Sequence, residues 1–102
     1  MTKEEANLFK ILGDINRLKI IKILTNTGKE VCACNFLKCV DCGQSTLSFH
    51  LQALSDCNLV TSRKDGKKIL YKINSDILKE LMNFIYSPCK DFNMEYFLQW
   101  KK

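Results

Sequence analysis

Apolar residues recur at helical spacing in two stretches at the start of the chain. The first stretch predicts a helix over residues 2–12, which Gly13 ends. The second predicts a helix over residues 15–25, with Asp14 as its N-cap. The apolar positions of this second helix are Leu18, Ile20, Ile21, Ile23 and Leu24. A helix with so wide an apolar face is expected at the centre of the fold.

Two further helices are expected in the middle of the chain, a short one over residues 31–39 and a longer one over residues 44–56. Their core candidates are Phe36, Leu37 and Val40 for the first, and Leu47, Leu51 and Leu54 for the second. A tight connection, Asp41-Cys42-Gly43, separates them. A short helix, a turn with glycine and a second helix together make the helix-turn-helix pattern.

The apolar period changes from helical to strand-like in residues 59–73, where two runs flank Asp65-Gly66. This is a strong signal for a β-hairpin. Residues 61–72 hold five cations and one acid, so the hairpin is predicted to be a basic wing. A last helix is expected from residue 75 to about residue 87. Its apolar stripe is Ile77, Leu78, Leu81, Met82 and Ile85.

Length and composition fit one domain spanning residues 1–102, because 46% of the residues are hydrophobic. The sequence has no run of about 18 apolar residues and no secretory leader, so we expect a cytoplasmic protein with no membrane partner. The net charge of +5 is compatible with nucleic acid as a partner. Cytoplasmic cysteine is usually reduced, so clustered cysteines indicate metal ligands or thiol sensors before disulfides.

Five of the six cysteines lie between residues 30 and 60. Their thiolates are soft ligands that select As(III), Cd(II), Pb(II), Zn(II) or Cu(I). Residues two apart on a regular helix point about 200° apart. Cys32 and Cys34 can therefore hold one ion only if Cys32 precedes the helix, or if binding distorts its first turn. The candidate metal ligands are Cys32, Cys34, Cys39, Cys42 and Cys89, with Cys39 and Cys42 ranked before Cys89 as the third ligand.

Base contacts are expected from the N-terminal part of the second helix of the helix-turn-helix, and phosphate contacts from the wing. The candidates are Gln44, Ser45, Thr46, Ser48 and Phe49 in the helix, and Arg63, Lys64, Lys67 and Lys68 in the wing. Phe49 has two alternative roles, contact with a thymine methyl group in DNA or packing against the protein. His50 lies toward the core side of the helix, so a packed, hydrogen-bonded histidine is expected. Cys57 is interpreted as a small buried apolar residue.

Three strings carry a resemblance to a known family: Cys32-Ala-Cys34, Gln44-Ser-Thr-Leu-Ser-Phe-His-Leu51, and the hairpin from Leu59-Val to Tyr71. They resemble the ArsR/SmtB family of metal-responsive winged-helix repressors over residues 5 to about 86. The resemblance implies a winged helix-turn-helix fold, mainly α with a β-hairpin wing, and a homodimer. It places the helix-turn-helix at about 31–57, the wing at about 59–73, and the dimerisation helices at about 3–12 and 75–87. It also implies a repressor that leaves double-stranded operator DNA when an inducer binds.

The Cys-x-Cys string resembles the arsenic-sensing and cadmium/lead-sensing branches of that family. The best-known arsenic repressors carry a third cysteine three residues later, where this chain has Leu37. The zinc-sensing branch uses Asp/His pairs on the last helix, which here has Asp76 but no histidine. The expected inducer is As(III) or Sb(III). The alternatives are a Cd(II)-, Pb(II)- or Zn(II)-responsive repressor and a thiol redox switch without metal. An enzyme is not expected, because the chain has one histidine and no catalytic constellation.

Overall fold

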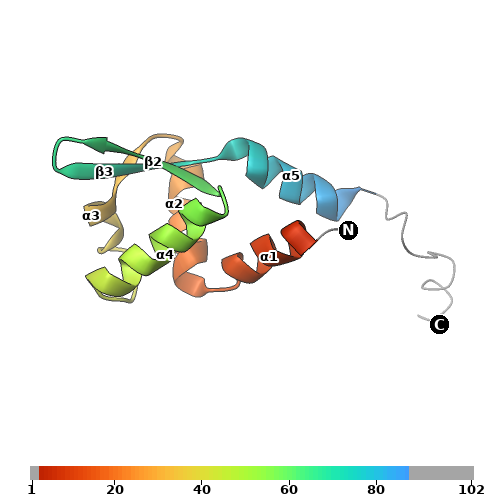
Figure 1. Ribbon diagram of the computed structural model, residues 1–102, viewed down its shortest axis with the longest axis horizontal. Coiled ribbons are helices and arrows are strands. Elements are labelled where there is room, and N and C mark those ends of the chain that lie inside the picture. Colours follow the sequence, from red (N-terminus) through yellow and green to blue (C-terminus); the bar gives the residue numbers. More distant parts are fainter. Residues whose placement is uncertain (1–2, 88–102) are drawn as a thin grey trace, which may run out of the picture.

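The computed structural model describes residues 3–87, which form five helices and a three-stranded antiparallel sheet (Figure 1). The elements in order are α1 (Lys3–Leu12), α2 (Ile15–Thr27), β1 (Val31–Cys32), α3 (Ala33–Phe36), α4 (Gln44–Asp56), β2 (Val60–Asp65), β3 (Lys68–Ile73) and α5 (Ser75–Tyr86). The β2–β3 hairpin projects at one end of the molecule, while α1 and α5 extend toward the other end (Figure 1). The arrangement confirms the predicted winged helix-turn-helix fold.

Both ends of α2 are set by local chemistry. The Asp14 carboxylate accepts hydrogen bonds from the backbone N–H groups of Asn16 (2.8 Å) and Arg17 (3.2 Å), as an N-cap does. At the other end Gly28 has a φ of +63°, and its N–H donates to the Leu24 carbonyl. The predicted cap at Asp14 is therefore confirmed, and the helix runs two residues beyond the predicted end at residue 25.

The predicted helix over residues 31–39 is wrong at both ends. Val31 and Cys32 form the short strand β1, which pairs with Tyr71 and Leu70 of β3. Helix α3 is a single turn. After it, the Phe36 carbonyl accepts hydrogen bonds from the backbone N–H groups of Cys39 and Val40. The edge of β3 that does not face β2 offers hydrogen-bond partners to residues 31 and 32. The local sequence pattern does not reveal these partners. The β-branched side chain of Val31 also suits a strand.

The hairpin forms as predicted, with its turn shifted by one residue. Asp65 pairs with Lys68, so the two connecting residues are Gly66 and Lys67 rather than Asp65 and Gly66. Gly66 has a φ of +64°, the left-handed region that glycine adopts without strain. β3 lies at the centre of the sheet, in the order β1-β3-β2. The segment that carries Cys32 is therefore joined directly to the wing.

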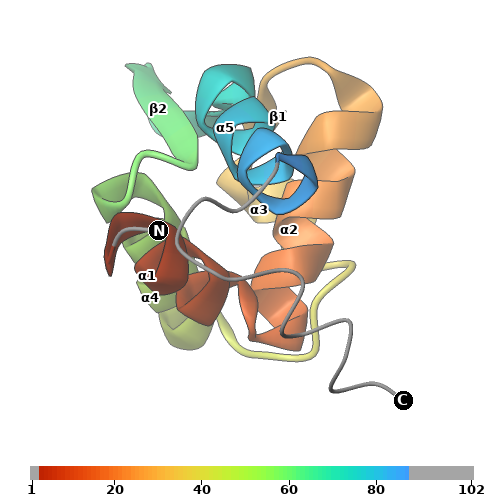
Figure 2. The ribbon, with the colours of Figure 1, turned by 90° about the vertical axis from the view of Figure 1, so that its right-hand side faces the viewer.

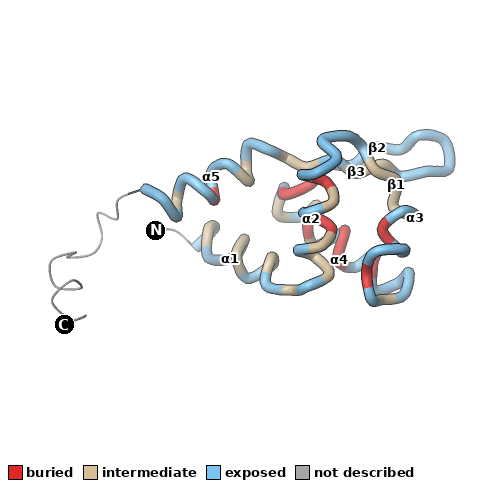
Figure 3. Tube along the Cα trace, turned by 180° about the vertical axis from the view of Figure 1, so that it is seen from behind, coloured by how far each residue is buried: buried red, intermediate tan, exposed pale blue. Residues whose placement is uncertain are grey.

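The core lies between α2, α4 and the base of the wing (Figure 3). Its fully buried large side chains are Ile20, Leu24, Phe36, Leu51, Leu54, Leu59, Val60 and Leu81. Val40 and Leu47 are also buried, as the apolar pattern predicts. The predicted core residue Leu37 is wrong, because its side chain is 37% exposed, and Leu18 of the apolar face of α2 is 50% exposed. The helical period marks an apolar face but does not tell which part of it a neighbour covers.

Helix α5 leaves much of its apolar stripe uncovered. Leu81 is fully buried, while Met82, Ile85 and Tyr86 are 41%, 55% and 86% exposed. In the end-on view, α5 and α1 both lie at the end of the molecule that faces the viewer, with α5 above α1 (Figure 2). The homodimer joined through these two helices stays a prediction. Within residues 3–87 no helix has both the length and the apolar character that crossing a membrane requires.

Candidate functional site

The two cysteines of the Cys-x-Cys string lie close together at the start of α3. Cys32 ends β1 with an extended backbone (φ −68°, ψ 140°), and Cys34 lies in the first turn of the helix. The two Sγ atoms are 2.9 Å apart. Because Cys32 precedes the helix, the divergence of about 200° between residues two apart on a helix does not apply. Of the two predicted arrangements, the structure has the one in which Cys32 lies before the helix.

Proximity gives the two thiols different acidities. The Cys34 thiol donates a hydrogen bond to Cys32, which lowers the pKa of Cys32, and Lys68 lowers it further by its positive charge. The same hydrogen bond raises the pKa of Cys34, because losing that proton would place two negative charges side by side. Cys32 is therefore the thiol of the pair that loses its proton first. A thiolate is the form that attacks or ligates a soft metal centre.

The cysteine pair lines a groove that it shares with the predicted DNA-contacting elements. The groove has a volume of about 330 Å³ and lies between α3, the start of α4 and the wing. Its polar members are Gln44, Ser48, Lys67 and Lys68, and its apolar members include Leu37, Leu47, Leu51, Ile69 and Tyr71. A ligand held by the thiols would therefore lie beside residues predicted to contact DNA.

The other predicted metal ligands lie apart from this pair. Cys39 is exposed in the loop after α3, and Cys42 is half-buried against the core. Within residues 3–87 no three Cys, His, Asp or Glu side chains gather as a metal site would require. Cys89 lies outside the described residues. The half-buried Cys57 thiol donates to the Leu54 carbonyl (3.4 Å), which fits the structural role predicted for it.

The exposed face of α4 carries all the helix residues predicted to contact DNA. Gln44, Ser45, Thr46 and Ser48 are exposed on the first turns of the helix. Phe49 is 64% exposed, and the Arg17 guanidinium carbon is 5.7 Å from its ring centroid. The ring is thus open to solvent on the face of α4 that carries the polar residues, and it is supported by a cation–π contact rather than by the core.

The wing presents exposed lysines at positions 64, 67 and 68, but its arginine is already paired. Arg63 donates to both carboxylate oxygens of Glu30, with distances of 2.6 and 2.8 Å. The hydrogen bond from Arg63 lowers the pKa of Glu30, and the same contact raises the pKa of Arg63. A DNA phosphate could bind Arg63 only by displacing the Glu30 carboxylate, which holds it through two hydrogen bonds. The sequence pattern missed Glu30 because 33 residues separate the partners.

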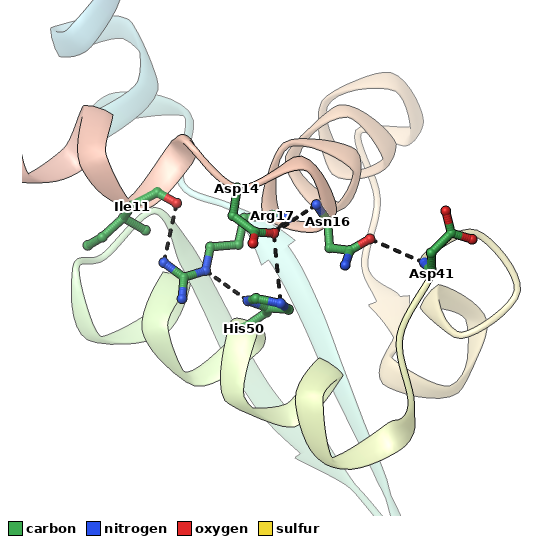
Figure 4. A network of polar contacts seen from close by, with 6 residues as sticks. All are labelled: Ile11, Asp14, Asn16, Arg17, Asp41 and His50. Atoms are coloured by element: carbon green, nitrogen blue, oxygen red, sulfur yellow. Dashed lines mark hydrogen bonds and ion pairs between the residues drawn. The ribbon is translucent and has the colours of Figure 1, made fainter.

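His50 joins α4 to the start of α2 through a polar network (Figure 4). It is only 7% exposed, and its Nδ1 accepts a hydrogen bond from Arg17 Nε at 2.9 Å. Its Nε2 lies 3.8 Å from an oxygen of Asp14, and Arg17 Nη1 also donates to the Ile11 carbonyl. The predicted packed, hydrogen-bonded histidine has the expected environment. Helical spacing placed His50 on the core side, but it gave no signal for Arg17 as its partner.

A second contact fixes the turn of the helix-turn-helix. The Asn16 side-chain carbonyl accepts from the Asp41 N–H at 3.2 Å, which ties the connection before α4 to α2 (Figure 4). With the His50 network, both the turn and the middle of α4 are held against α2. A recognition helix fixed on a core helix, with its polar face outward and a basic hairpin beside it, defines a winged-helix DNA-binding protein.

Comparisons with known proteins agree with this class. Residues 14–62 match the family model described as bacterial regulatory protein, arsR family. The chain is 42% identical over 80 residues to an arsenical resistance operon repressor from Staphylococcus aureus, covering 78% of this chain and 75% of that one. It is 38% identical over 81 residues to the cadmium resistance transcriptional regulatory protein CadC of Listeria innocua, covering 79% and 67%.

Solved structures give the same fold. An ArsR-like transcriptional regulator from Rhodococcus sp. RHA1 superposes with a TM-score of 0.69 at 23% identity, covering 96% of this chain and 83% of that one. The chain belongs to the arsR family of bacterial regulatory proteins. Membership confirms the predictions of a DNA-binding transcriptional repressor and of a protein that is not an enzyme.

Proposed function

We propose that the chain represses transcription from an operator and releases it when Cys32 and Cys34 bind trivalent arsenic or antimony. The observation that carries this proposal is the 2.9 Å separation of the two Sγ atoms. Two adjacent thiols, of which Cys32 has a lowered pKa, suit a soft thiophilic ion. Similarity to an arsenical resistance repressor supports the choice of inducer. In this proposal the protein is a cytoplasmic homodimer joined through α1 and α5.

A third ligand for inorganic arsenite has three candidates in the sequence. Cys39 and Cys42 are close along the chain, but residues 3–87 contain no three-ligand cluster in this conformation. Either residue would need the loop after α3 to move. Cys89 would reach the pair from the C-terminal segment of the same chain or of the partner. We therefore keep Cys39, Cys42 and Cys89 as candidates, to be separated by single Cys→Ser variants.

Release follows from the position of the thiols beside the DNA-contacting elements. Cys32 belongs to β1, which pairs with β3 of the wing, and its groove reaches Gln44 and Ser48 of α4. An inducer in this groove changes the spacing of wing and helix or blocks their approach to DNA. It shifts the equilibrium only as far as it binds the DNA-free form more tightly than the DNA-bound form.

In the DNA complex we assign base contacts to the exposed start of α4 and phosphate contacts to the wing. The proposed base-contacting residues are Gln44, Ser45, Thr46, Ser48 and Phe49. Lys64, Lys67 and Lys68 are the proposed phosphate ligands. Arg63 would join them only if Glu30 releases it, since the two side chains form a bidentate pair in the free protein. The exposed ring of Phe49 favours contact with a thymine methyl group over packing.

Replacing Lys67 and Lys68 together by alanine should weaken operator binding and reduce its salt dependence. Each phosphate contact contributes about 0.9 to the slope of log K against log salt, and the proposed dimer loses two such lysines from each protomer, so the slope should fall by about 3.6. Binding measured by fluorescence anisotropy between 50 and 300 mM salt tests this. The control is Lys22→Ala with Lys29→Ala, which makes the same change in net charge at exposed positions outside α4, the wing and the proposed dimerisation helices. An unchanged affinity and slope would mean that Lys67 and Lys68 do not contact the phosphates of the operator.

A cadmium, lead or zinc sensor is the second candidate, supported by the 38% identity to a cadmium resistance regulator. Thiolates suit these ions as well, and they commonly take four ligands. In that case Cys89 and one further cysteine would complete the site with Cys32 and Cys34. The coordination number therefore distinguishes the two candidates.

The deciding experiment counts protected thiols in the reduced protein, under argon, while As(III), Sb(III), Cd(II) or Zn(II) is added. Operator release is followed in parallel by anisotropy. Three thiols protected per chain by As(III), with release, support the arsenic repressor. Four protected by Cd(II), with weak As(III) binding, support the cadmium candidate. No protection by any ion, but release on oxidation, would leave the thiol redox switch.

A further inference from the structure

Arg17, at the start of α2, lies against the exposed aromatic ring of the helix that is proposed to contact bases. We propose that Arg17 is a positioning residue for sequence recognition, which holds the Phe49 ring where it contacts the methyl group of one thymine per protomer. The inference rests on the proposed function, in which Phe49 contacts a thymine methyl group. It assigns to Arg17 the rigidity that this contact requires, and it is carried by the hydrogen bonds of the guanidinium and by the exposure of the ring.

Two hydrogen bonds to different helices fix the Arg17 side chain (Figure 4). Its Nε donates to His50 Nδ1 of α4 at 2.9 Å, and its Nη1 donates to the Ile11 carbonyl of α1 at 3.3 Å. The Ile11 carbonyl belongs to the last turn of α1, where carbonyl groups have no partner within the helix. His50 is buried, so its ring is a rigid support for the guanidinium. The planar guanidinium is thereby held in one orientation beside α4.

The Phe49 ring is held by this guanidinium and by the neighbouring histidine. The Arg17 guanidinium carbon lies 5.7 Å from the Phe49 ring centroid, within the distance of about 6 Å at which a cation–π contact is attractive. The His50 ring meets the Phe49 ring edge-on, with the two centroids 6.0 Å apart. Phe49 nevertheless stays 64% exposed. A ring that is already held in place loses less conformational entropy on binding than a free one does.

The ring lies among the residues proposed to contact bases. Ser45 and Thr46 precede Phe49 by four and three residues, so the three exposed side chains lie on one face of α4. A phenylalanine has no hydrogen-bonding group, so it reads a base edge by apolar contact, and thymine presents a methyl group in the major groove. A ring fixed by its neighbours meets that methyl group at one base pair, whereas a mobile ring would contact several.

The test measures the binding of DNA duplexes in which one thymine at a time is replaced by deoxyuridine, which lacks only the methyl group. The parent duplex is obtained by in vitro selection with the wild-type protein, and affinity is measured by fluorescence anisotropy. In the wild-type protein, one such replacement should weaken binding about fourfold, the value of burying one methyl group. Phe49→Ala should abolish this methyl effect.

Arg17→Gln and Arg17→Lys should still bind the selected duplex but reduce the methyl effect to below about twofold, because neither side chain has a planar guanidinium to hold the ring. The control is Lys22→Gln, which removes the same charge from an exposed position of α2 and should keep the full methyl effect. Urea unfolding identifies the variants that fold. If Arg17→Gln does not fold, Arg17→Lys, which keeps the charge and most of the length, decides the test.

A purely structural role of Arg17 would weaken binding to every duplex equally and leave the methyl effect at about fourfold. This result would overturn the inference. A smaller salt dependence with an unchanged methyl effect would also overturn it, because Arg17 would then be a phosphate ligand. If Phe49→Ala loses the methyl effect but the folded Arg17 variants keep it, only this inference fails. If the wild-type protein shows no methyl effect, or Phe49→Ala retains it, the proposed contact of Phe49 with thymine fails as well.

Discussion

The variant Cys34→Ser is expected to bind the operator like the wild-type protein but no longer to release it when arsenite is added. The Cys34 side chain is exposed and contributes nothing to the core, so its replacement should not disturb the fold. Serine keeps a donor beside Cys32 but offers a hard oxygen in place of a soft sulfur. A single thiolate then remains at the site. Titration of arsenite against the protein–DNA complex by anisotropy should show a half-release concentration raised about a hundredfold or more, equivalent to about 2.8 kcal/mol.

Cys57→Ser is the matched control for this experiment. The Cys57 thiol donates to the Leu54 carbonyl, a contact that a serine hydroxyl can also make. It lies at the end of α4 and does not line the groove. This variant should therefore respond to arsenite like the wild-type chain. Loss of DNA binding by Cys34→Ser, without added arsenite, would mean that Cys34 is structural and would remove the basis of the proposed switch.

Local chemistry explains why some features could be predicted from the sequence. Helix α4 has the predicted bounds, Gln44–Asp56, because its apolar residues repeat at i, i+4 and i+7 within one continuous helix. Asp14 caps α2 because a carboxylate at that position reaches the first N–H groups of the helix. In both cases the partners lie within a few residues of one another, so a single sequence contains the information.

Partners far apart in the sequence explain what was missed. Residues 31 and 32 form a strand only because β3 offers them a free edge some forty residues later. The sequence predicts a phosphate contact for Arg63, because nothing near it in the sequence reveals Glu30 as its partner. The exposed Leu18 belongs to an apolar helix whose neighbours cover only one side of it. The candidate site depends on these long-range contacts, since they set the extended backbone at Cys32 and so the distance between the two thiols.

Phe36 anchors the cysteine-bearing turn, so Phe36→Ala is expected to be strongly destabilising. Its side chain is the only buried one in α3, with 0% exposure. Its ring packs edge-on against the ring of Tyr71, with the two ring centroids 6.4 Å apart. Truncating a buried phenylalanine costs about 3–5 kcal/mol, and a domain of this kind has about 5–15 kcal/mol in total. Urea unfolding at one fixed protein concentration, which matters for a dimer, should show a lower midpoint with an unchanged m-value.

Two further variants show whether the effect comes from the ring itself. Phe36→Leu keeps most of the buried volume and should cost less than about 1.5 kcal/mol. Lys38 is exposed and lies two residues away. The free energy of unfolding of Lys38→Ala should therefore stay within about 0.5 kcal/mol of the wild-type value. Because Phe36 holds α3 against β3, the alanine variant should also need more arsenite for release while its thiols remain chemically intact. If Phe36→Ala lowers the free energy of unfolding by less than about 1 kcal/mol, α3 is anchored by the pairing of β1 with β3 instead of by the Phe36 ring. The thiols would then be linked to the wing by the strand β1 alone.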